Sequence, residues 1–147
     1  MSRLRTVSSK RLEDLLAAAP DALEADREMR RQIQKGIGAR WYALIGVGVA
    51  GLLRCERFVD ELRGPLEKSF AVQLAADWTK LPLTDEERAI LSYTEKGTLD
   101  EASVRRRDVE PLRQAGLADK DILLIAAAIA YHNYAIRMAA AFDVIPR

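Results

Sequence analysis

The only cysteine of this chain, Cys55, is the residue whose type best suits covalent chemistry. Two arginines, Arg54 and Arg57, lie close to it in the sequence, and nearby cations favour the thiolate that acts as a nucleophile. A lone cysteine beside an apolar segment can equally be a small buried hydrophobic residue. Cys55 is therefore a candidate nucleophile, with Arg57 as a candidate stabiliser of its thiolate.

The only histidine, His132, is the second candidate for chemistry, within the segment YHNY at 131–134. It can be a hydrogen-bonded core or interface residue. It can also be a catalytic partner of Cys55, because such partners need to be close only in space. A metal site is not expected, since the chain has no second histidine or cysteine to share the ion.

Three glycines, Gly46, Gly48 and Gly51, match the G-x-G-x-x-G fingerprint of dinucleotide-binding proteins. That fingerprint works only between a strand and a helix of a βαβ unit, and nothing downstream supplies a parallel sheet. We interpret the glycines as small residues that let a neighbouring helix approach closely. No cofactor is expected.

Charge and length set limits on the partners and the location of the protein. Lys and Arg total 23 against 22 Asp and Glu, so the net charge of +1 gives no general attraction for nucleic acid. The run Arg105, Arg106 and Arg107 is surrounded by acidic residues and fits a solvated helix start. The uncharged run 41–53 is too short to span a membrane. A single cysteine and no signal-peptide pattern predict a cytoplasmic protein.

The elements that must position these residues are expected to be helices. Ala and Leu are abundant, and no segment alternates apolar and polar residues with a period of two. The 147 residues suit one domain, 1–147, of about six to seven helices. The segment 39–53 is apolar on every side and should be buried in a core or a subunit interface. The charged residues of the helix expected at 20–35, Asp26 among them, should line a solvated face.

Three segments of the C-terminal half carry a resemblance to a known family. The stretches LPLTDEERAILSYTEK at 81–96, DVEPLRQAGLADKDIL at 108–123 and AYHNYAIRMA at 130–139 resemble peroxidase-related members of the alkylhydroperoxidase D-like (carboxymuconolactone decarboxylase) superfamily. With Pro20 and the apolar segment before Cys55, the likeness covers about 20–144. It implies an all-α, single-domain helical fold and a homo-oligomer, a trimer or a hexamer.

The resemblance also implies a chemistry whose residues are mostly replaced here. In the family, one cysteine attacks a hydroperoxide and a second resolves the sulfenic acid as a disulfide, while a histidine and a glutamate handle protons. Laid on this chain, the first cysteine falls on Cys55, the second on Phe58, the histidine on Leu62 and the glutamate on Ala43. An attached resolving thiol, which protects a sulfenic acid from over-oxidation, is therefore missing.

Two functions remain open at this point. The first is a one-cysteine thiol peroxidase that reduces a hydroperoxide through Cys55 and uses an external thiol as resolver. The second is a non-catalytic pseudoenzyme, either an oligomeric helical scaffold or a protein that binds a small apolar ligand in the remodelled pocket.

Overall fold

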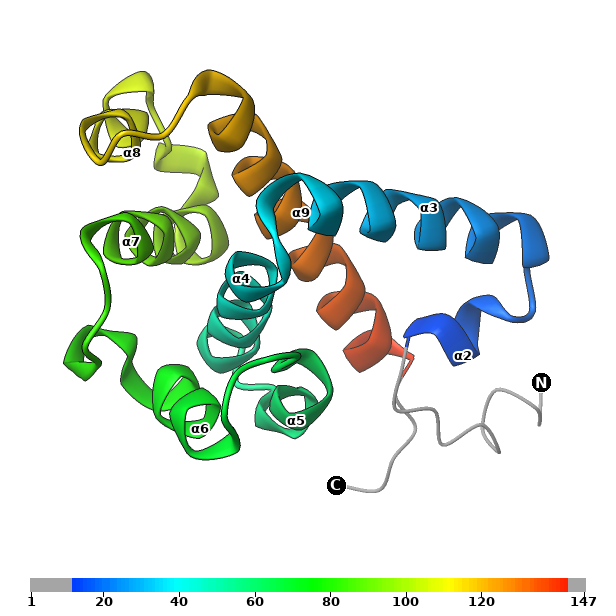
Figure 1. Ribbon diagram of the computed structural model, residues 1–147. Helices are drawn as coiled ribbons and strands as arrows, with labels where there is room; N and C mark the ends of the chain where they lie inside the picture. The colour runs from blue at the N-terminus through cyan, green and yellow to red at the C-terminus, as the bar shows by residue number, and fades with distance from the viewer. Residues whose placement is uncertain (1–11, 143–147) are drawn as a thin grey trace.

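The computed structural model describes residues 12–142, and every regular element in that range is helical. The all-α prediction is therefore confirmed (Figure 1). The longer helices are α3 (Pro20–Ile37), α4 (Ala39–Leu52), α6 (Lys68–Asp77), α7 (Asp85–Leu99) and α9 (Asp119–Ala141). Shorter helices are α2 (Leu12–Leu16), α5 (Val59–Leu62) and α8 (Glu110–Gln114), with 3-10 turns η1 (Glu56–Phe58), η2 (Trp78–Lys80), η3 (Glu101–Ser103) and η4 (Arg106–Val109).

Helix α4 lies at the centre of the fold and packs against α6, α7 and α9 (Figure 1). Residues 43–50 of this helix are all buried, including both glycines among them. The apolarity of the sequence over 41–53 is explained by this position, because a helix surrounded by other helices has no face left for water. The prediction of a helix buried all round is confirmed for residues 43–50, whereas Arg40 near the start is exposed.

Local sequence signals set several helix ends. Pro20 occupies the first turn of α3, where its missing N–H is not needed. Gly38 separates α3 from α4 with φ of 88°, a conformation that residues with a Cβ rarely adopt. The side chain of Thr84 accepts a hydrogen bond from the backbone N–H of Glu87, and Glu87 accepts one from the backbone of Thr84. The expected capping box is thus present at the start of α7.

The glycines of α4 allow neighbouring helices to approach closely. A Cβ on Gly51 would lie 2.2 Å from the carbonyl oxygen of Ala75 in α6, and one on Gly48 would lie 3.1 Å from Leu91 in α7. The described chain has no strand before these glycines, so the context of a dinucleotide fingerprint is missing. The interpretation of the glycines as packing residues is confirmed.

The expectation that Asp26 lies on a solvated face was wrong. Its side chain is only 4% exposed and accepts hydrogen bonds from the hydroxyl of Tyr131 at 2.8 Å and from Arg30 at 3.0 Å. Helix α9 packs on α3 and covers Asp26. The sequence pattern of α3 did not indicate this, because the residue type of an aspartate does not reveal whether its carboxylate is buried with partners or solvated.

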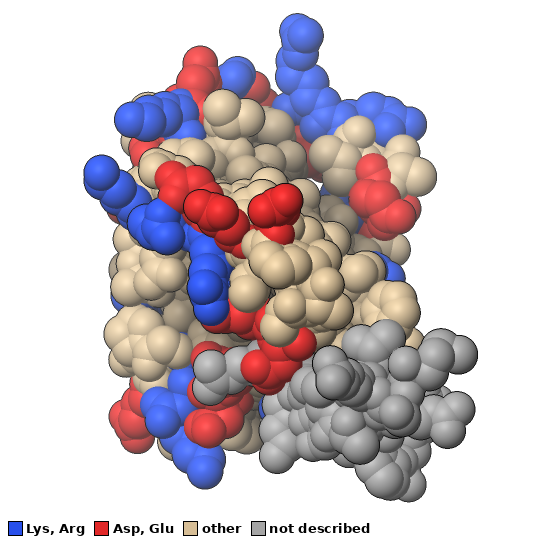
Figure 2. Space-filling view, turned by 90° about the vertical axis from the view of Figure 1, so that its right-hand side faces the viewer, with Lys and Arg blue, Asp and Glu red and all other residues tan. Residues whose placement is uncertain are grey.

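The described surface carries charges of both signs, interspersed on the face that Figure 2 shows. The run Arg105, Arg106 and Arg107 is exposed. Asp108 beside it accepts hydrogen bonds from the backbone N–H of Arg105 at 2.7 Å and from Lys96 at 3.0 Å. The run therefore forms a solvated start to η4 with an acidic residue built into it, as expected.

Helix α9 has the length and the mean hydropathy, 1.4, of a membrane-spanning helix. In this fold it packs against α3, α4 and α7 and buries residues such as Ile125, Ala128, Ile129 and Ile136 between them. A long core helix of a globular domain has the same composition, so these two properties alone do not indicate a membrane span.

Candidate functional site

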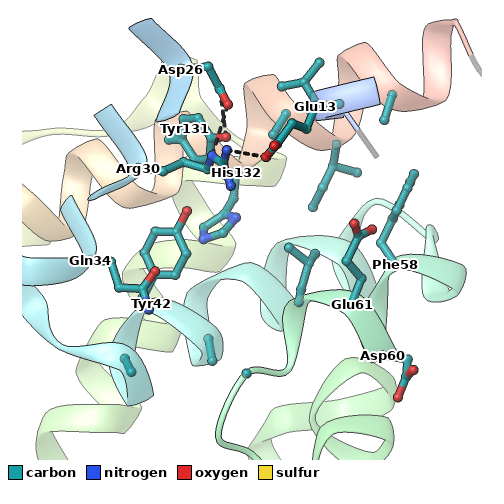
Figure 3. Close-up of a pocket in the computed structure, with 18 of the residues that line it drawn as sticks. Glu13, Asp26, Arg30, Gln34, Tyr42, Phe58, Asp60, Glu61, Tyr131 and His132 are labelled. Atoms are coloured by element: carbon teal, nitrogen blue, oxygen red, sulfur yellow. Dashed lines mark hydrogen bonds and ion pairs between the residues drawn. The ribbon is translucent and has the colours of Figure 1, made fainter. Parts of the chain in front are cut away.

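A cavity of about 540 Å³ opens between α3, α4, α5 and α9, with the first residues of α2 at its edge (Figure 3). One end is polar and is formed by side chains of α2, α3, α4 and α9. The opposite wall, from η1, α5 and the end of α9, combines the apolar side chains of Phe58, Leu62 and Ile136 with the carboxylates of Asp60 and Glu61. The lining comprises Leu12, Glu13, Asp26, Arg30, Gln34, Ala39, Tyr42, Ala43, Phe58, Asp60, Glu61, Leu62, Gly64, Pro65, Tyr131, His132, Ala135, Ile136 and Ala139.

A chain of hydrogen bonds crosses the polar end. The Tyr131 hydroxyl donates to Asp26 Oδ1 at 2.8 Å, Arg30 Nε donates to Asp26 Oδ2 at 3.0 Å, and Arg30 Nη2 donates to Glu13 Oε2 at 2.7 Å. Glu13 also accepts from Arg27, and the hydrogen bonds from Arg27 and Arg30 hold its pKa below the usual value. Burial and the neighbouring Asp26 carboxylate raise the pKa of Tyr131, so its proton stays in place at neutral pH.

His132 sits beside this chain and is 1% exposed. Neither of its ring nitrogens has a hydrogen-bond partner of good geometry among the described residues. Burial lowers its pKa from 6.5 to about 4, and a weak interaction with the backbone of Tyr42 only partly opposes that shift. The imidazole is therefore neutral at pH 7, with one nitrogen able to donate a hydrogen bond and the other able to accept one.

Two neighbours hold the imidazole of His132 in position. The ring of Tyr42 lies 4.5 Å from it, centroid to centroid, and the ring of Tyr131 lies 5.6 Å away. On α4, a Cβ at Gly46 would come within 2.8 Å of the imidazole carbon Cε1, so this glycine makes room for the ring. In Figure 3 the Tyr42 hydroxyl points toward the polar end near Arg30 and Asp26.

The three positions at which the resemblance places the missing catalytic groups meet on this same cavity. Ala43, Phe58 and Leu62 all line it, although they come from α4, η1 and α5. Ala43 and Phe58 are buried, at 2% and 5% exposure. None of the three carries a group that can transfer a proton or form a disulfide, so these three positions offer a ligand only apolar contact.

The structure places Cys55 outside that lining, in the turn between α4 and η1. The side chain is partly exposed, and its Sγ lies 3.5 Å from the carbonyl oxygen of Leu53. Arg54 beside it has a positive φ of 58°, and the guanidinium of Arg57 lies 4.6 Å from the ring centroid of Phe58. Cys55 and His132 thus do not share the cavity wall, and the catalytic roles of Cys55, His132 and Arg57 stay predictions.

Sequence reasoning missed Asp26, Tyr42 and Gly46 as parts of the site. The sequence showed Tyr131 and His132 as adjacent residues, but the residues that contact them come from helices far away in the chain. The one usable signal was a glycine, Gly46, inside a helix otherwise made of good packing residues, since such a glycine often marks close approach of another group. Among the described residues, no group of three or more His, Cys, Asp or Glu side chains could hold a metal ion.

Comparison with known proteins gives structural matches only. No protein-family model and no curated protein sequence matches the chain. An uncharacterised peroxidase-related protein from Silicibacter sp. superposes with a TM-score of 0.80 and 24% identity, over 92% of this chain and 75% of that one. The AhpD core of an uncharacterised peroxidase-related protein from Ralstonia eutropha superposes with a TM-score of 0.74 and 22% identity, over 99% of this chain and 90% of that one.

A third match is a protein of unknown function from Agrobacterium tumefaciens, provisionally assigned as the antioxidant defence protein AhpD. Its TM-score is 0.71 with 26% identity, over 87% of this chain and 92% of that one. All three superpositions span most of both chains, so they involve the whole helical arrangement rather than one shared motif. The resemblance read from the sequence is confirmed at the level of the fold: this chain has the alkylhydroperoxidase AhpD-like fold of peroxidase-related proteins.

Proposed function

We propose that this protein binds a small, largely apolar molecule in the cavity between α3, α4, α5 and α9, and does not carry out a two-cysteine peroxidase cycle. The observation that supports this most directly is the convergence of Ala43, Phe58 and Leu62 on the lining of one cavity of about 540 Å³. Pockets for small molecules usually measure roughly 300–1,000 Å³ and are mostly apolar with a few polar groups. This cavity has that size, and its lining is divided about evenly between apolar and polar residues.

The chemistry of the wall supports binding rather than turnover. A two-cysteine cycle needs a second thiol to attack the sulfenic acid and groups that give and take protons. Phenyl, isobutyl and methyl side chains stand at the positions that the resemblance assigns to those groups. They can still remove apolar surface of a ligand from water, which is worth roughly 25 cal/mol per Å².

Filling the cavity tests this proposal. A tryptophan in Leu62→Trp would occupy the apolar wall, whereas Leu123→Trp places the same side chain on α9 at a position that is 69% exposed. The unfolding of the wild type and both variants is followed with a panel of small aromatic and aliphatic molecules. A ligand at one hundred times its Kd stabilises the folded state by about 3 kcal/mol.

We expect at least one molecule of the panel to raise the Tm of the wild type and of Leu123→Trp but not of Leu62→Trp. The proposal fails if no molecule shifts the Tm of the wild type. It also fails if Leu62→Trp responds as the wild type does, because the ligand would then bind elsewhere.

A one-cysteine thiol peroxidase is the second candidate, and the partial exposure of Cys55 favours it. In that reaction the thiolate attacks the hydroperoxide, giving the alcohol and a sulfenic acid. Two external thiols then reduce the sulfenic acid to the thiol, releasing water and leaving as their disulfide. Consumption of cumene hydroperoxide is measured with excess dithiothreitol for the wild type and Cys55→Ser. Equal background rates eliminate this candidate, whereas turnover that requires Cys55 establishes it.

Assembly into a trimer or hexamer, implied by the resemblance, stays a prediction. The exposed apolar side chains of Val72, on α6, and Tyr134, on α9, support it. Light scattering coupled to size-exclusion chromatography measures the mass directly, and a monomer mass at micromolar concentration would contradict the prediction.

A further inference from the structure

The two ring nitrogens of His132 are the buried side-chain polar atoms without a hydrogen-bond partner in the described part of the chain. Almost all buried polar groups in folded proteins have a partner, and the exceptions call for an explanation such as an absent water or ligand. His132 is 1% exposed and lines the cavity, so a ligand there reaches its nitrogens by displacing the side chains that cover them.

The polar groups around His132 are already engaged with one another. Asp26 accepts from Tyr131 and Arg30, and Arg30 also donates to Glu13. The imidazole is left out of this chain although it lies beside it (Figure 3). A group that binds His132 therefore does not have to break a hydrogen bond between these side chains, and the fixed neighbours leave the imidazole pre-positioned.

The charges of the lining decide which ligands are acceptable. It contains four carboxylates, on Glu13, Asp26, Asp60 and Glu61, against one guanidinium, on Arg30. The imidazole adds no positive charge at neutral pH. An anion would be repelled by the carboxylates, while those of Asp26, Glu13 and Asp60 already have an arginine partner. A neutral ligand fits best.

A hydroxyl group suits the imidazole in either tautomer. It can donate to the unprotonated nitrogen or accept from the protonated one, whichever faces the cavity, whereas a ketone or ether can only accept. The apolar wall of Phe58, Leu62 and Ile136 then receives the body of the molecule.

We propose that the ligand of this cavity is a small neutral molecule with an apolar body and a hydroxyl group, of the phenol or alcohol class, whose hydroxyl hydrogen-bonds to His132. This inference rests on the proposed function and specifies the ligand class for it. His132 then acts as the residue that selects the ligand, and Gly46 acts by leaving space for the imidazole.

Three matched probes test the proposal on the full chain by calorimetry: 4-ethylphenol, ethylbenzene and 4-ethylbenzoate. We expect 4-ethylphenol to bind about fivefold more tightly than ethylbenzene, the factor given by one net hydrogen bond, and 4-ethylbenzoate to bind most weakly. In His132→Phe the phenol should lose its advantage, while the Kd of ethylbenzene stays within about threefold of the wild-type value.

A second measurement needs no variant and so does not depend on the folding of His132→Phe. The chain has a single histidine, so its imidazole ¹⁵N resonances are assigned without ambiguity. They should move when 4-ethylphenol is added and stay close to their starting positions with ethylbenzene. Equal affinities for the two probes, or no imidazole shift with the phenol, would overturn this inference while leaving the binding proposal intact. Failure of all three probes to bind would count against both.

Discussion

Acidification should destabilise this protein through one residue, His132, well before the carboxylates titrate. The imidazole has a pKa of about 4 in the folded chain against 6.5 in an unfolded one, because burial disfavours its charged form. As the pH falls below 6.5, the unfolded state takes up a proton that the folded state does not. Stability therefore falls with decreasing pH and levels off only below the folded pKa of about 4.

The size of the effect follows from that pKa difference. The complete shift corresponds to a loss of about 3 kcal/mol in the free energy of unfolding. Between pH 7 and pH 5 the loss is about 2 kcal/mol, a large part of the stability of a typical domain. Carboxylates such as Glu13 and Glu87 have pKa values below their ordinary ones in the folded chain, so the stability they contribute is lost only at lower pH.

Urea unfolding at pH 7, 6 and 5 measures the effect, for the wild type and for His132→Phe. Since the chain has no other histidine, the variant should show almost no change in unfolding free energy over this range. At pH 7 it should be about as stable as the wild type or more so, because two unpaired buried nitrogens are removed. If both proteins lose stability equally, or the wild type loses none, the reasoning about His132 is refuted.

Three further substitutions probe the packing and the hydrogen bonds that hold the site. In Gly51→Ala the new methyl group would lie 2.2 Å from a backbone oxygen of α6, so the free energy of unfolding should fall by about 1–3 kcal/mol. In the control Gly97→Ala the nearest atom to the new methyl group is 3.4 Å away, and stability should be unchanged or higher. Equal urea midpoints for the two would contradict the close packing of α4 on α6. Thr84→Ala removes the N-cap of α7 and should cost about 1 kcal/mol by urea unfolding, whereas a serine there should keep most of it. Tyr131→Phe leaves Asp26 with one partner fewer and should cost about 1–3 kcal/mol in thermal unfolding, and an unchanged Tm would show that their hydrogen bond contributes little.

Much of the fold was readable from the chain because local signals agreed with one another. The apolarity of 39–53, the proline at the start of α3 and the Thr84 capping box each depend on residues within a few positions of one another. Such signals survive in any tertiary context. The resemblance over 20–144 was likewise carried by whole segments, so it predicted the AhpD-like fold that the superpositions confirm.

The candidate site was harder to predict from the sequence, because its groups meet only after α3, α4, α5 and α9 have packed. Cys55 and His132 could be picked out by type, but nothing in their spacing could show that only His132 lines the cavity. The burial of Asp26 is a second example, since its main partner, Tyr131, is 105 residues away in the chain.

The sequence by itself determined the helices, their approximate ends and the presence of a single cysteine, since these depend on residue types and short-range spacing. Only the tertiary structure decided that the three replaced positions line one cavity, and that Gly46 leaves room for an imidazole without a side-chain partner. The physical reason is that burial and hydrogen-bond satisfaction depend on what surrounds a group in space. The same histidine has a pKa of 6.5 in water and about 4 in this core, and its one-letter code is identical in both places.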